Sequence, residues 1–336
     1  MLKILIITSG TVQNMLLFPL SKILNNKYNF KTSVINVNKL TNLNKISSYF
    51  INIRLFKPIK YHLEYFNILR NLKILKPDIV ITGFHFGSPF IEACKRLNIK
   101  NVLWDMDGIY FYGHSLDEFK NYDFIFTVGK FSEKIFNKLG VRSGWLPLAF
   151  DPEIFKPLYY KRELDIFFAG SPINLPFRTN NYRKYLILLI EKYGHKLYLA
   201  GSPKWRKTNI INACKYLGEI PYKHLNLLYN LSKINLNILR DDVVNDYLAI
   251  NSRFFEILGS GSFQISSEIK GIHELFEINK EIVIARSPEE MLELVEYYLN
   301  NEEKRLKIAN RGYRKAIEYH TIEKRAEVIS KIIKKL

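Results

Sequence analysis

The sequence predicts an α/β fold built from two Rossmann-like domains that face each other across a cleft. Three observations support this prediction. The chain has 336 residues, more than the roughly 100–200 residues of one domain. Short β-branched apolar runs alternate with helical periodicity along most of the sequence, and a proline-rich stretch interrupts that alternation near the middle. We expect an N-terminal domain over residues 1–148, a C-terminal domain over 149–319, and a closing helix over 320–336 that packs back on the N-terminal domain.

The first half begins with a buried strand. The run from Lys3 to Thr8 is almost entirely apolar, and Ser9 and Gly10 follow it in a turn, which is typical of a parallel strand covered on both faces. By the same reasoning we expect further strands at 32–37, 78–82, 101–104 and 123–128. Helical spacing of apolar residues predicts helices at 12–24, 59–75, 89–97 and 131–139.

The second half resumes the alternation after a linker. Pro147, Pro152 and Pro157 fall within eleven residues and predict an extended connection. Strands are then expected at 165–169, 196–200, 233–239, 263–266 and 281–284. Helices are expected at 181–192, 221–231, 252–258, 288–299, 302–319 and 321–333. Since ligands of open parallel sheets bind beyond the carboxyl ends of the strands, functional residues should lie just after each strand.

Two loops of the first half carry polar candidates. Ser9 and Gly10 could offer backbone N–H groups to an anion, although the segment lacks the glycine spacing of a dinucleotide site and reads equally as a plain turn. His85 lies between Gly83 and Gly87 after another strand. Its imidazole could bind a sugar hydroxyl or relay a proton, or could be a structural turn residue.

Asp105 and Asp107 follow the strand expected at 101–104. A pair of carboxylates two residues apart can hold a divalent cation, and one carboxylate alone can act as a general base. For Asp105 we favour the alternative that it caps a turn. Asp107 is the main catalytic candidate of this half, together with His85, and Ser9, Gly10 and Asp105 are further candidate binding residues.

Two consecutive strands of the second half end in similar loops. Gly170 and Ser171 follow the first strand, with Arg178 shortly before a helix, and the same pattern of small residues followed by a cation recurs after the next strand. A glycine that lets backbone approach, a hydroxyl and a cation together suit a diphosphate. The second loop contributes Gly201, Ser202 and Lys204.

Arginine and glutamate mark a third position in the second half. Arg240 ends a strand, and Arg253 and Glu256 are spaced to share one face of the next helix near its N-terminus. An ion pair on the surface of a helix would explain the spacing, but it would not explain Gly259 and Gly261, which flank a serine directly after the helix. We therefore favour a ligand site.

Composition and charge indicate which kind of partner and which compartment to expect. The chain has 50 Lys and Arg against 32 Asp and Glu, a net charge of +18, and 15 of these basic residues stand against three acidic ones in the first 100 positions. Such an excess favours an anionic partner, although a solvated basic face would also account for it. Cys94 and Cys214 lie far apart in apolar segments and predict two reduced thiols. With neither a signal peptide nor a membrane span in the pattern, we expect a cytoplasmic protein.

Four segments of the sequence resemble those of a known protein family. The run 252–263, the segment 271–276, the linker 145–155 and the carboxylate motif 104–107 look like glycosyltransferases of the B-type fold. The similarity is greatest to the CgeB-like (spore maturation protein) branch, which is related to glycosyltransferase family 4, the glycosyl transferases of group 1. It is specific over about residues 145–325 and loose over 1–100.

The resemblance implies roles for several residues. Glu256 would hold the ribose of a UDP- or GDP-sugar, Arg253 and Arg240 would neutralise its diphosphate, and the loops at Gly170 and Gly201 would line the donor site. Backbone at Gly218 and Ile220 would contact the base. Many relatives carry a second Glu eight positions before the ribose-binding one, where this chain has Leu248. No metal and no cofactor are implied, because this fold commonly neutralises diphosphate with side chains and helix dipoles.

The expected function is therefore transfer of a sugar from a nucleotide-diphosphate sugar, retaining and independent of metal. Two alternatives stay open: a sugar-nucleotide epimerase of the same fold, and an inactive protein that binds nucleotides or polyanions. The acceptor is expected to be anionic or lipid-linked, or a glycan or protein, and nucleic acid is not expected. The segment from Lys39 to Lys76 mixes basic and aromatic residues, which suits peripheral contact with an anionic membrane.

Overall fold

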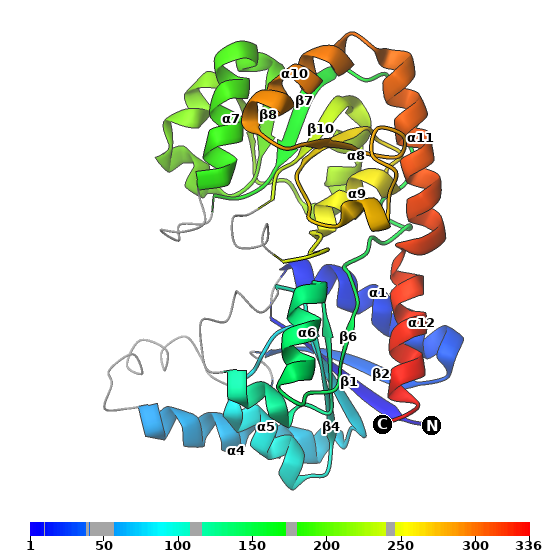
Figure 1. Ribbon diagram of the computed structural model, residues 1–336. Coiled ribbons are helices and arrows are strands. Elements are labelled where there is room, and N and C mark those ends of the chain that lie inside the picture. The colour runs from blue at the N-terminus through cyan, green and yellow to red at the C-terminus, as the bar shows by residue number, and fades with distance from the viewer. Residues whose placement is uncertain (10, 38–39, 41–56, 108–115, 173–179, 240–245) are drawn as a thin grey trace. The chain divides into compact units, whose positions relative to one another are not determined.

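The chain forms two compact units, each with its own sheet (Figure 1). The computed structural model describes residues 1–9, 11–37, 40, 57–107, 116–172, 180–239 and 246–336. Unit 1 comprises residues 1–147 and 322–336, and unit 2 comprises residues 148–321. The end of the chain is therefore part of the same unit as its beginning.

Unit 1 contains a parallel six-stranded sheet in the order β2-β1-β3-β4-β5-β6. Its strands are β1 (Lys3–Thr8), β2 (Lys31–Asn36), β3 (Ile79–Thr82), β4 (Lys100–Asp105), β5 (Phe124–Thr127) and β6 (Ser143–Trp145). Its helices are α1 (Thr11–Tyr28), α4 (Lys57–Leu75), α5 (Ser88–Arg96), α6 (Lys130–Lys138) and α12 (Ile322–Ile333), with a 3₁₀ segment η3 (Leu116–Asn121).

Helices cover both faces of this sheet. Leu5 and Ile7 of β1 pack in a buried cluster with residues of α4 and α5, while Ile4 and Ile6 point to the opposite face and are equally buried. Helix α1 packs beside α12, and α4 packs beside α5. Because both faces are buried, the strand is continuously apolar, as the sequence predicts.

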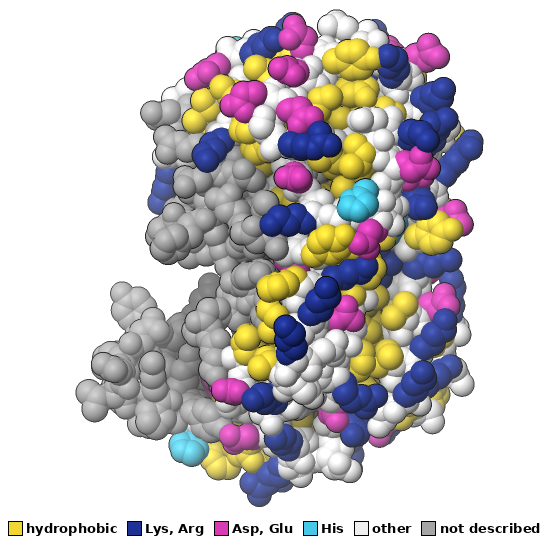
Figure 2. Space-filling model, viewed as in Figure 1, with side chains coloured by type: hydrophobic (Ala, Val, Ile, Leu, Met, Phe, Trp, Pro, Cys, Tyr) yellow, Lys and Arg dark blue, Asp and Glu magenta, His cyan; other side chains and the backbone are white. Residues whose placement is uncertain are grey.

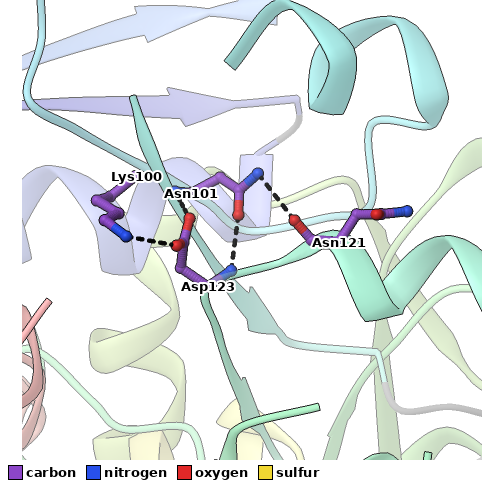
Figure 3. A network of polar contacts seen from close by, with 4 residues as sticks. All are labelled: Lys100, Asn101, Asn121 and Asp123. Carbon is purple, nitrogen blue, oxygen red and sulfur yellow. Dashed lines mark hydrogen bonds and ion pairs between the residues drawn. The ribbon is translucent and has the colours of Figure 1, made fainter. Parts of the chain in front are cut away.

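A polar network ties the starting ends of β4 and β5 together (Figure 3). The amide of Asn101 donates to Asp123 Oδ2 over 2.9 Å, and the amide of Asp123 donates to Asn101 Oδ1 over 2.8 Å. Lys100 Nζ lies 3.0 Å from Asp123 Oδ1. These reciprocal bonds fix the register at the amino-terminal ends of the two strands. Ligands of such sheets bind at the opposite, carboxyl ends.

Unit 2 contains a second parallel six-stranded sheet, in the order β12-β11-β10-β7-β8-β9. Its strands are β7 (Leu164–Ala169), β8 (Leu197–Ala200), β9 (Lys215–Gly218), β10 (Ser232–Asn237), β11 (Gln264–Ser267) and β12 (Val283–Ala285). Its α-helices are α7 (Asn180–Tyr193), α8 (Leu225–Leu231), α9 (Ser252–Gly259), α10 (Pro288–Leu299) and α11 (Glu302–Tyr319). The 3₁₀ segments are η4 (Gly194–Lys196), η5 (Pro203–Lys207), η6 (Asn209–Ala213), η7 (Tyr222–His224) and η8 (Ile272–Glu274).

The two faces of the second sheet differ in polarity. Ile166 and Phe168 of β7 join an apolar cluster with residues of α7 and α10. On the other face, Phe167 contacts the ring of Tyr229 from α8, and the Asn235 side chain donates to the Tyr229 carbonyl over 3.1 Å. The face covered by α8 and α9 is therefore the one that carries buried polar groups.

The sequence predicts most of these elements, with three corrections. The predicted strand 3–8 and the predicted helices 288–299 and 302–319 are confirmed residue for residue. The edge strands β6 and β9 were not predicted, because they are short and their pairing partners come from the rest of the sheet. The helix expected at 221–231 begins as the 3₁₀ turn η7 and becomes α-helical only at Leu225.

The linker is packed rather than a free extended connection. Trp145 ends β6, and Asp151 closes a turn in which its carboxylate accepts from the Glu153 amide over 2.9 Å. Further on, the amides of Lys156 and Leu158 donate to side chains of α8 over 3.1 and 2.8 Å. The side chains of α8 thus fix this segment against unit 2.

Candidate functional site

The loops after β7 and β8 lie against each other, as their similar sequences suggest. Gly201 has φ +147°, and a Cβ added there would lie 1.8 Å from the Gly170 carbonyl oxygen, so only glycine fits. Trp205 Nε1 donates to the same carbonyl over 2.7 Å. At Gly170, a Cβ would lie 2.7 Å from the Phe168 ring. Gly201 is therefore required by close approach of the two loops, and Gly170 by the neighbouring Phe168 ring of its own strand.

Hydroxyl and backbone contacts extend this arrangement to a third strand. The Ser202 amide donates to Ser171 Oγ over 3.2 Å, and the Gly201 amide donates to the Gly218 carbonyl over 2.8 Å. Ser202 Oγ accepts from the amide of Lys204, an exposed residue, over 3.3 Å. The carboxyl ends of β7, β8 and β9 therefore form one small-residue surface.

Helix α9 brings a guanidinium to this surface. The Asn251 side chain caps the helix by accepting from the Phe254 amide over 3.3 Å. Arg253, in the first turn, lies with Cζ 4.8 Å from the centre of the Phe168 ring and donates to the Ile238 carbonyl over 3.4 Å. Its Nη2 lies 3.5 Å from the position of a Cβ added at Gly170. A half-buried cation thus stands beside the loop in which backbone can approach an anion.

Glu256 lies one turn further along α9, and 3 % of it is exposed. Its Oε1 accepts from the Tyr222 hydroxyl over 3.0 Å, and its Oε2 accepts from the Tyr229 hydroxyl over 3.4 Å. Burial raises the pKa of the Glu256 carboxyl, against the opposing effects of a bond from Ser252, the two phenols and the Arg253 charge. Burial, together with the Glu256 charge, also raises the pKa of both phenols well above their ordinary value, so the phenols keep their protons and act as donors.

The remaining residues expected on the donor side have varied surroundings. Leu248, where many relatives have glutamate, is buried and has φ +58°, and its amide donates to the Lys270 carbonyl over 2.9 Å. Ile220 is half-buried at the surface after β9. Arg178 and Arg240 lie outside the described residues.

In unit 1, His85 is held through both ring nitrogens. Nε2 lies 2.9 Å from Glu118 Oε2, and Nδ1 lies 3.2 Å from the Tyr122 hydroxyl. The ring stacks on Phe119 with centroids 4.4 Å apart. These contacts fix the loop after β3, and the catalytic role of His85 stays a prediction.

The two aspartates after β4 differ in exposure. Asp105 is buried, with Oδ1 accepting from the Asp107 amide and Oδ2 from the Thr127 hydroxyl, each over 3.4 Å, so it closes the turn. Asp107 is half-buried, Ser9 is exposed, and Gly10 lies outside the described residues. Within the part of the chain that the structure describes, no three His, Cys, Asp or Glu side chains are grouped as a metal would need.

The structure adds residues that the sequence analysis missed. The Arg253 guanidinium lies over the Phe168 ring, and the hydroxyls of Tyr222 and Tyr229 donate to Glu256. Tyr222 lies 34 positions from Glu256, so no local spacing connects them. Its place directly after Pro221, four residues beyond the glycine that ends β9, is the one signal in the sequence.

Comparison with solved structures identifies the fold. Sucrose-phosphate synthase (tll1590) from Thermosynechococcus elongatus superposes with a TM-score of 0.73 at 10 % identity, over 100 % of this chain and 99 % of that one. Anabaena Alr3699/HepE in complex with UDP and glucose gives 0.72 at 12 % identity, over 100 % of both chains. The lipopolysaccharide outer core galactosyltransferase WaaB gives 0.63 at 14 % identity, again over 100 % of both. The two parallel α/β sheets therefore have the glycosyltransferase B fold.

Sequence comparison covers the C-terminal part of the chain. The profile of the family described as "Glycosyl transferase-like" matches residues 178–331, which include Arg253 and Glu256. No curated protein matches the sequence significantly. The chain is thus similar to glycosyltransferases in fold throughout and in sequence over residues 178–331.

Proposed function

We propose that this protein is a glycosyltransferase that takes a sugar from a nucleoside-diphosphate sugar. The observation that carries the proposal is the position of Arg253. Its guanidinium lies over the Phe168 ring and beside Gly170, and Glu256 follows one turn later on α9. It supplies a fixed cation beside the small residues at the carboxyl ends of β7 and β8. The family profile over this unit and the UDP complexes of Anabaena Alr3699/HepE support the same reading.

In the proposed reaction the bond between the sugar C1 and the diphosphate oxygen breaks, and a bond from C1 to an acceptor oxygen forms. The departing diphosphate takes the electron pair of the broken bond and accepts the proton that the acceptor hydroxyl loses. Arg253 stabilises the charge on the leaving oxygen, which lowers the barrier because the charge develops in the transition state. We propose that the anomeric configuration is retained and that side chains, not a metal ion, neutralise the diphosphate.

The acceptor is proposed to bind unit 1. Helix α4 carries exposed apolar and basic side chains on one face, among them Leu63, Phe66, Arg70 and Lys73. Over much of the face of the molecule in Figure 2, basic side chains lie interspersed with acidic ones. In the described part of the chain, no helix has the length and apolar character to cross a membrane. We propose that α4 contacts an anionic, lipid-linked acceptor or its membrane from the cytoplasmic side.

The finer assignment to the CgeB-like branch stays a prediction.

Donor binding can be tested by thermal unfolding with a panel of nucleoside diphosphates and their sugars. A ligand at a hundredfold excess over its Kd adds about 2.7 kcal/mol to stability, which a shift in Tm detects. Incubation with the sugar nucleotide alone separates the epimerase alternative, since an epimerase converts it without acceptor. Absence of any shift would contradict the proposal and favour a protein without nucleotide function.

Arg253→Ala tests the carrying observation. We expect the fold to persist and transfer to fall by about 10²–10³-fold, the cost of losing one group that stabilises transition-state charge. Lys215→Ala is the matched control, because Lys215 lies over the Tyr198 ring at 4.9 Å but at the start of β9, away from the carboxyl ends. Unchanged turnover in Arg253→Ala, measured by release of the nucleoside diphosphate, would contradict the proposal.

A further inference from the structure

A short basic turn directly follows the second candidate donor loop. Segment η5 (Pro203–Lys207) carries three cations, all of them exposed: Lys204, Arg206 and Lys207. In the sequence around it, no acidic residue lies between Glu191 and Glu219. The stabilisation of the leaving diphosphate proposed above does not use these charges, so the basic turn needs an explanation of its own.

The basic turn is held firmly against the two candidate donor loops. Trp205 is buried, and its indole Nε1 donates to the Gly170 carbonyl over 2.7 Å. The Trp205 amide donates to the Ser202 carbonyl over 3.0 Å, and the Trp205 carbonyl accepts from the Thr208 hydroxyl over 2.7 Å. Because Trp205 anchors the turn, the cations on either side of it keep a fixed place beside the carboxyl ends of β7 and β8.

The cations of the basic turn lie close to one another. Side chains three positions apart in a 3₁₀ turn lie on the same side, so Lys204 and Lys207 are neighbours, and like charges at this spacing repel. Among the ion pairs formed by the residues that the structure describes, none includes these lysines or Arg206. Glu219, exposed directly after β9, offsets one of the three charges and leaves an excess of positive charge, which an approaching anion would relieve.

The exposure of these cations determines how they can act on an anion. A charge that stays in water gains little from contact with a bound partner, but its field reaches about 10 Å at an ionic strength of about 0.1 M. A nucleoside-diphosphate sugar is negatively charged at its diphosphate. Positive charge around a binding site raises the rate at which an anion arrives there, and charges at the rim of an interface mainly change the association rate.

We propose that the basic turn draws the anionic donor towards the loops after β7 and β8, and that Lys204, Arg206 and Lys207 act on its rate of association without contacting the bound donor. This inference rests on the proposed function and changes the role that the sequence suggests for Lys204. Capture of the donor then depends on residues that take no part in the transfer itself.

The experiment compares two triple variants that lose the same charge. The test variant is Lys204→Gln with Arg206→Gln and Lys207→Gln. The control variant replaces exposed lysines at or shortly before the starts of β7, β8 and β9: Lys161→Gln with Lys196→Gln and Lys215→Gln. A strand as short as β8 spans about 13 Å, which exceeds the reach of the field at about 0.1 M salt, so the control charges should not guide the donor.

The probe is whichever of UDP, GDP, ADP, CDP and dTDP raises the Tm of the wild type most, and stopped-flow mixing with a fluorescently labelled form of it gives both rate constants. At about 0.1 M salt we expect the test variant to associate about fivefold more slowly than the wild type, since steering by the charges of a whole protein gives about 10–10³-fold. At about 1 M salt, where the field reaches about 3 Å, the association rates should agree. The dissociation rate constant should stay unchanged, and the control variant should associate like the wild type.

Arg206→Gln with Lys207→Gln provides a second variant in case the test variant does not fold. This pair leaves Lys204, whose amide donates to the capping Ser202 hydroxyl, in place. With two of the three charges removed, association should slow by about threefold at about 0.1 M salt.

Further outcomes distinguish the two proposals. Faster dissociation of the test variant with unchanged association would mean that the cations contact the bound nucleotide, and equal slowing in both triple variants would assign association to net charge alone. In either case the inference is wrong while the proposed function stands, because the nucleotide still binds. If the wild type binds none of these nucleotides, both proposals are wrong. Thermal unfolding of each variant without ligand confirms that the compared proteins are folded.

Discussion

Glu256 is a buried carboxyl whose protonation affects stability. Burial raises its pKa above the ordinary value of 4.5, so above that pH the folded protein holds a proton that the unfolded chain has released. The free energy of unfolding therefore falls as pH rises from about 4.5 through the folded pKa. The hydrogen bonds that Tyr222 and Tyr229 donate to Glu256 reduce this loss of stability but do not remove it, because burial has the larger effect on the pKa.

Glu256→Gln should remove this part of the pH dependence. We expect the difference in unfolding free energy between Glu256→Gln and wild type to grow in favour of the variant as pH rises above 4.5. Urea unfolding of both proteins from about pH 4 to about pH 8 measures the difference, because this range begins near the ordinary pKa of a glutamate. Since other titrating groups contribute equally to both proteins, parallel curves would show that the Glu256 pKa is unchanged by folding.

At the residue scale, local spacing found the cation and the carboxylate but not their partners. Arg253 and Glu256 share a helix face, which the sequence indicates directly. Tyr222 and Phe168 reach them only through the sheet, by contacts between residues far apart in the chain. His85 shows the same limit, because its contacts with Glu118 and Tyr122 come from a 3₁₀ segment, and the residue after it, that the sequence did not reveal.

At the scale of elements, a directed chain of hydrogen bonds fixes the start of α9. The Ser266 hydroxyl donates to the Ser267 carbonyl over 2.9 Å and accepts from Asn237 Nδ2 over 3.0 Å. Asn237 Oδ1 therefore accepts from Asn251 Nδ2, over 2.9 Å. This leaves Asn251 Oδ1 to accept from the Phe254 amide. Strands β10 and β11 thereby orient the cap of the helix that carries Arg253.

Asn251→Ala should cost more than loss of an ordinary helix cap. An N-cap is worth about 1 kcal/mol, and the variant also leaves Asn237 Oδ1 buried without this donor, at a further cost of about 1–3 kcal/mol. Ser287→Ala is the control, since Ser287 caps α10 by accepting from the Glu290 amide over 3.1 Å. Urea unfolding compares the two, and equal losses would contradict a role for the chain. In the double variant with Asn237→Ala the losses should not add.

The predicted helices agree best with the structure where caps and proline mark their ends. The sequence places Ser287 and Pro288 at the start of α10, and its bounds were predicted exactly as observed because both signals are local. β9 alternates between exposed and half-buried positions and ends in a glycine, which no periodicity separates from a loop. Edge strands are defined by the neighbour they pair with, so they were found only in the folded chain.

At the scale of the whole molecule, the alternation of strands and helices was enough to predict two α/β domains. The division of the chain places 322–336 with the first 147 residues, and α12 packs beside α1. The sequence predicts a closing helix on the N-terminal domain but not its partner, because that partner is a surface of α1 about 300 positions earlier in the chain. Solved structures with 10–14 % identity share the fold, which shows how little of the sequence the architecture requires.

The excess of positive charge is also a property of the whole molecule, and its distribution gives the last prediction. The first 100 residues hold 15 basic and three acidic side chains. In α4, exposed Arg70 and Lys73 accompany Phe66, of which 61 % is exposed. A basic residue near an anionic bilayer contributes about 1 kcal/mol to binding, and an exposed aromatic adds apolar contact. If α4 is the acceptor-side surface, neutral substitutions there should weaken membrane binding more than the same loss of charge elsewhere in unit 1.

Arg70→Gln with Lys73→Gln should therefore weaken binding to vesicles of phosphatidylglycerol and phosphatidylcholine by roughly 30-fold, the equivalent of about 2 kcal/mol. Lys22→Gln with Lys27→Gln makes the same change in net charge on exposed positions of α1, which packs beside α12 rather than α4, and should have a smaller effect. Cosedimentation at two salt concentrations measures both pairs, and nucleotide-induced shifts in Tm should be the same in all variants. Equal weakening by the two pairs would assign the binding to net charge alone, and α4 would then have no special part in reaching the acceptor.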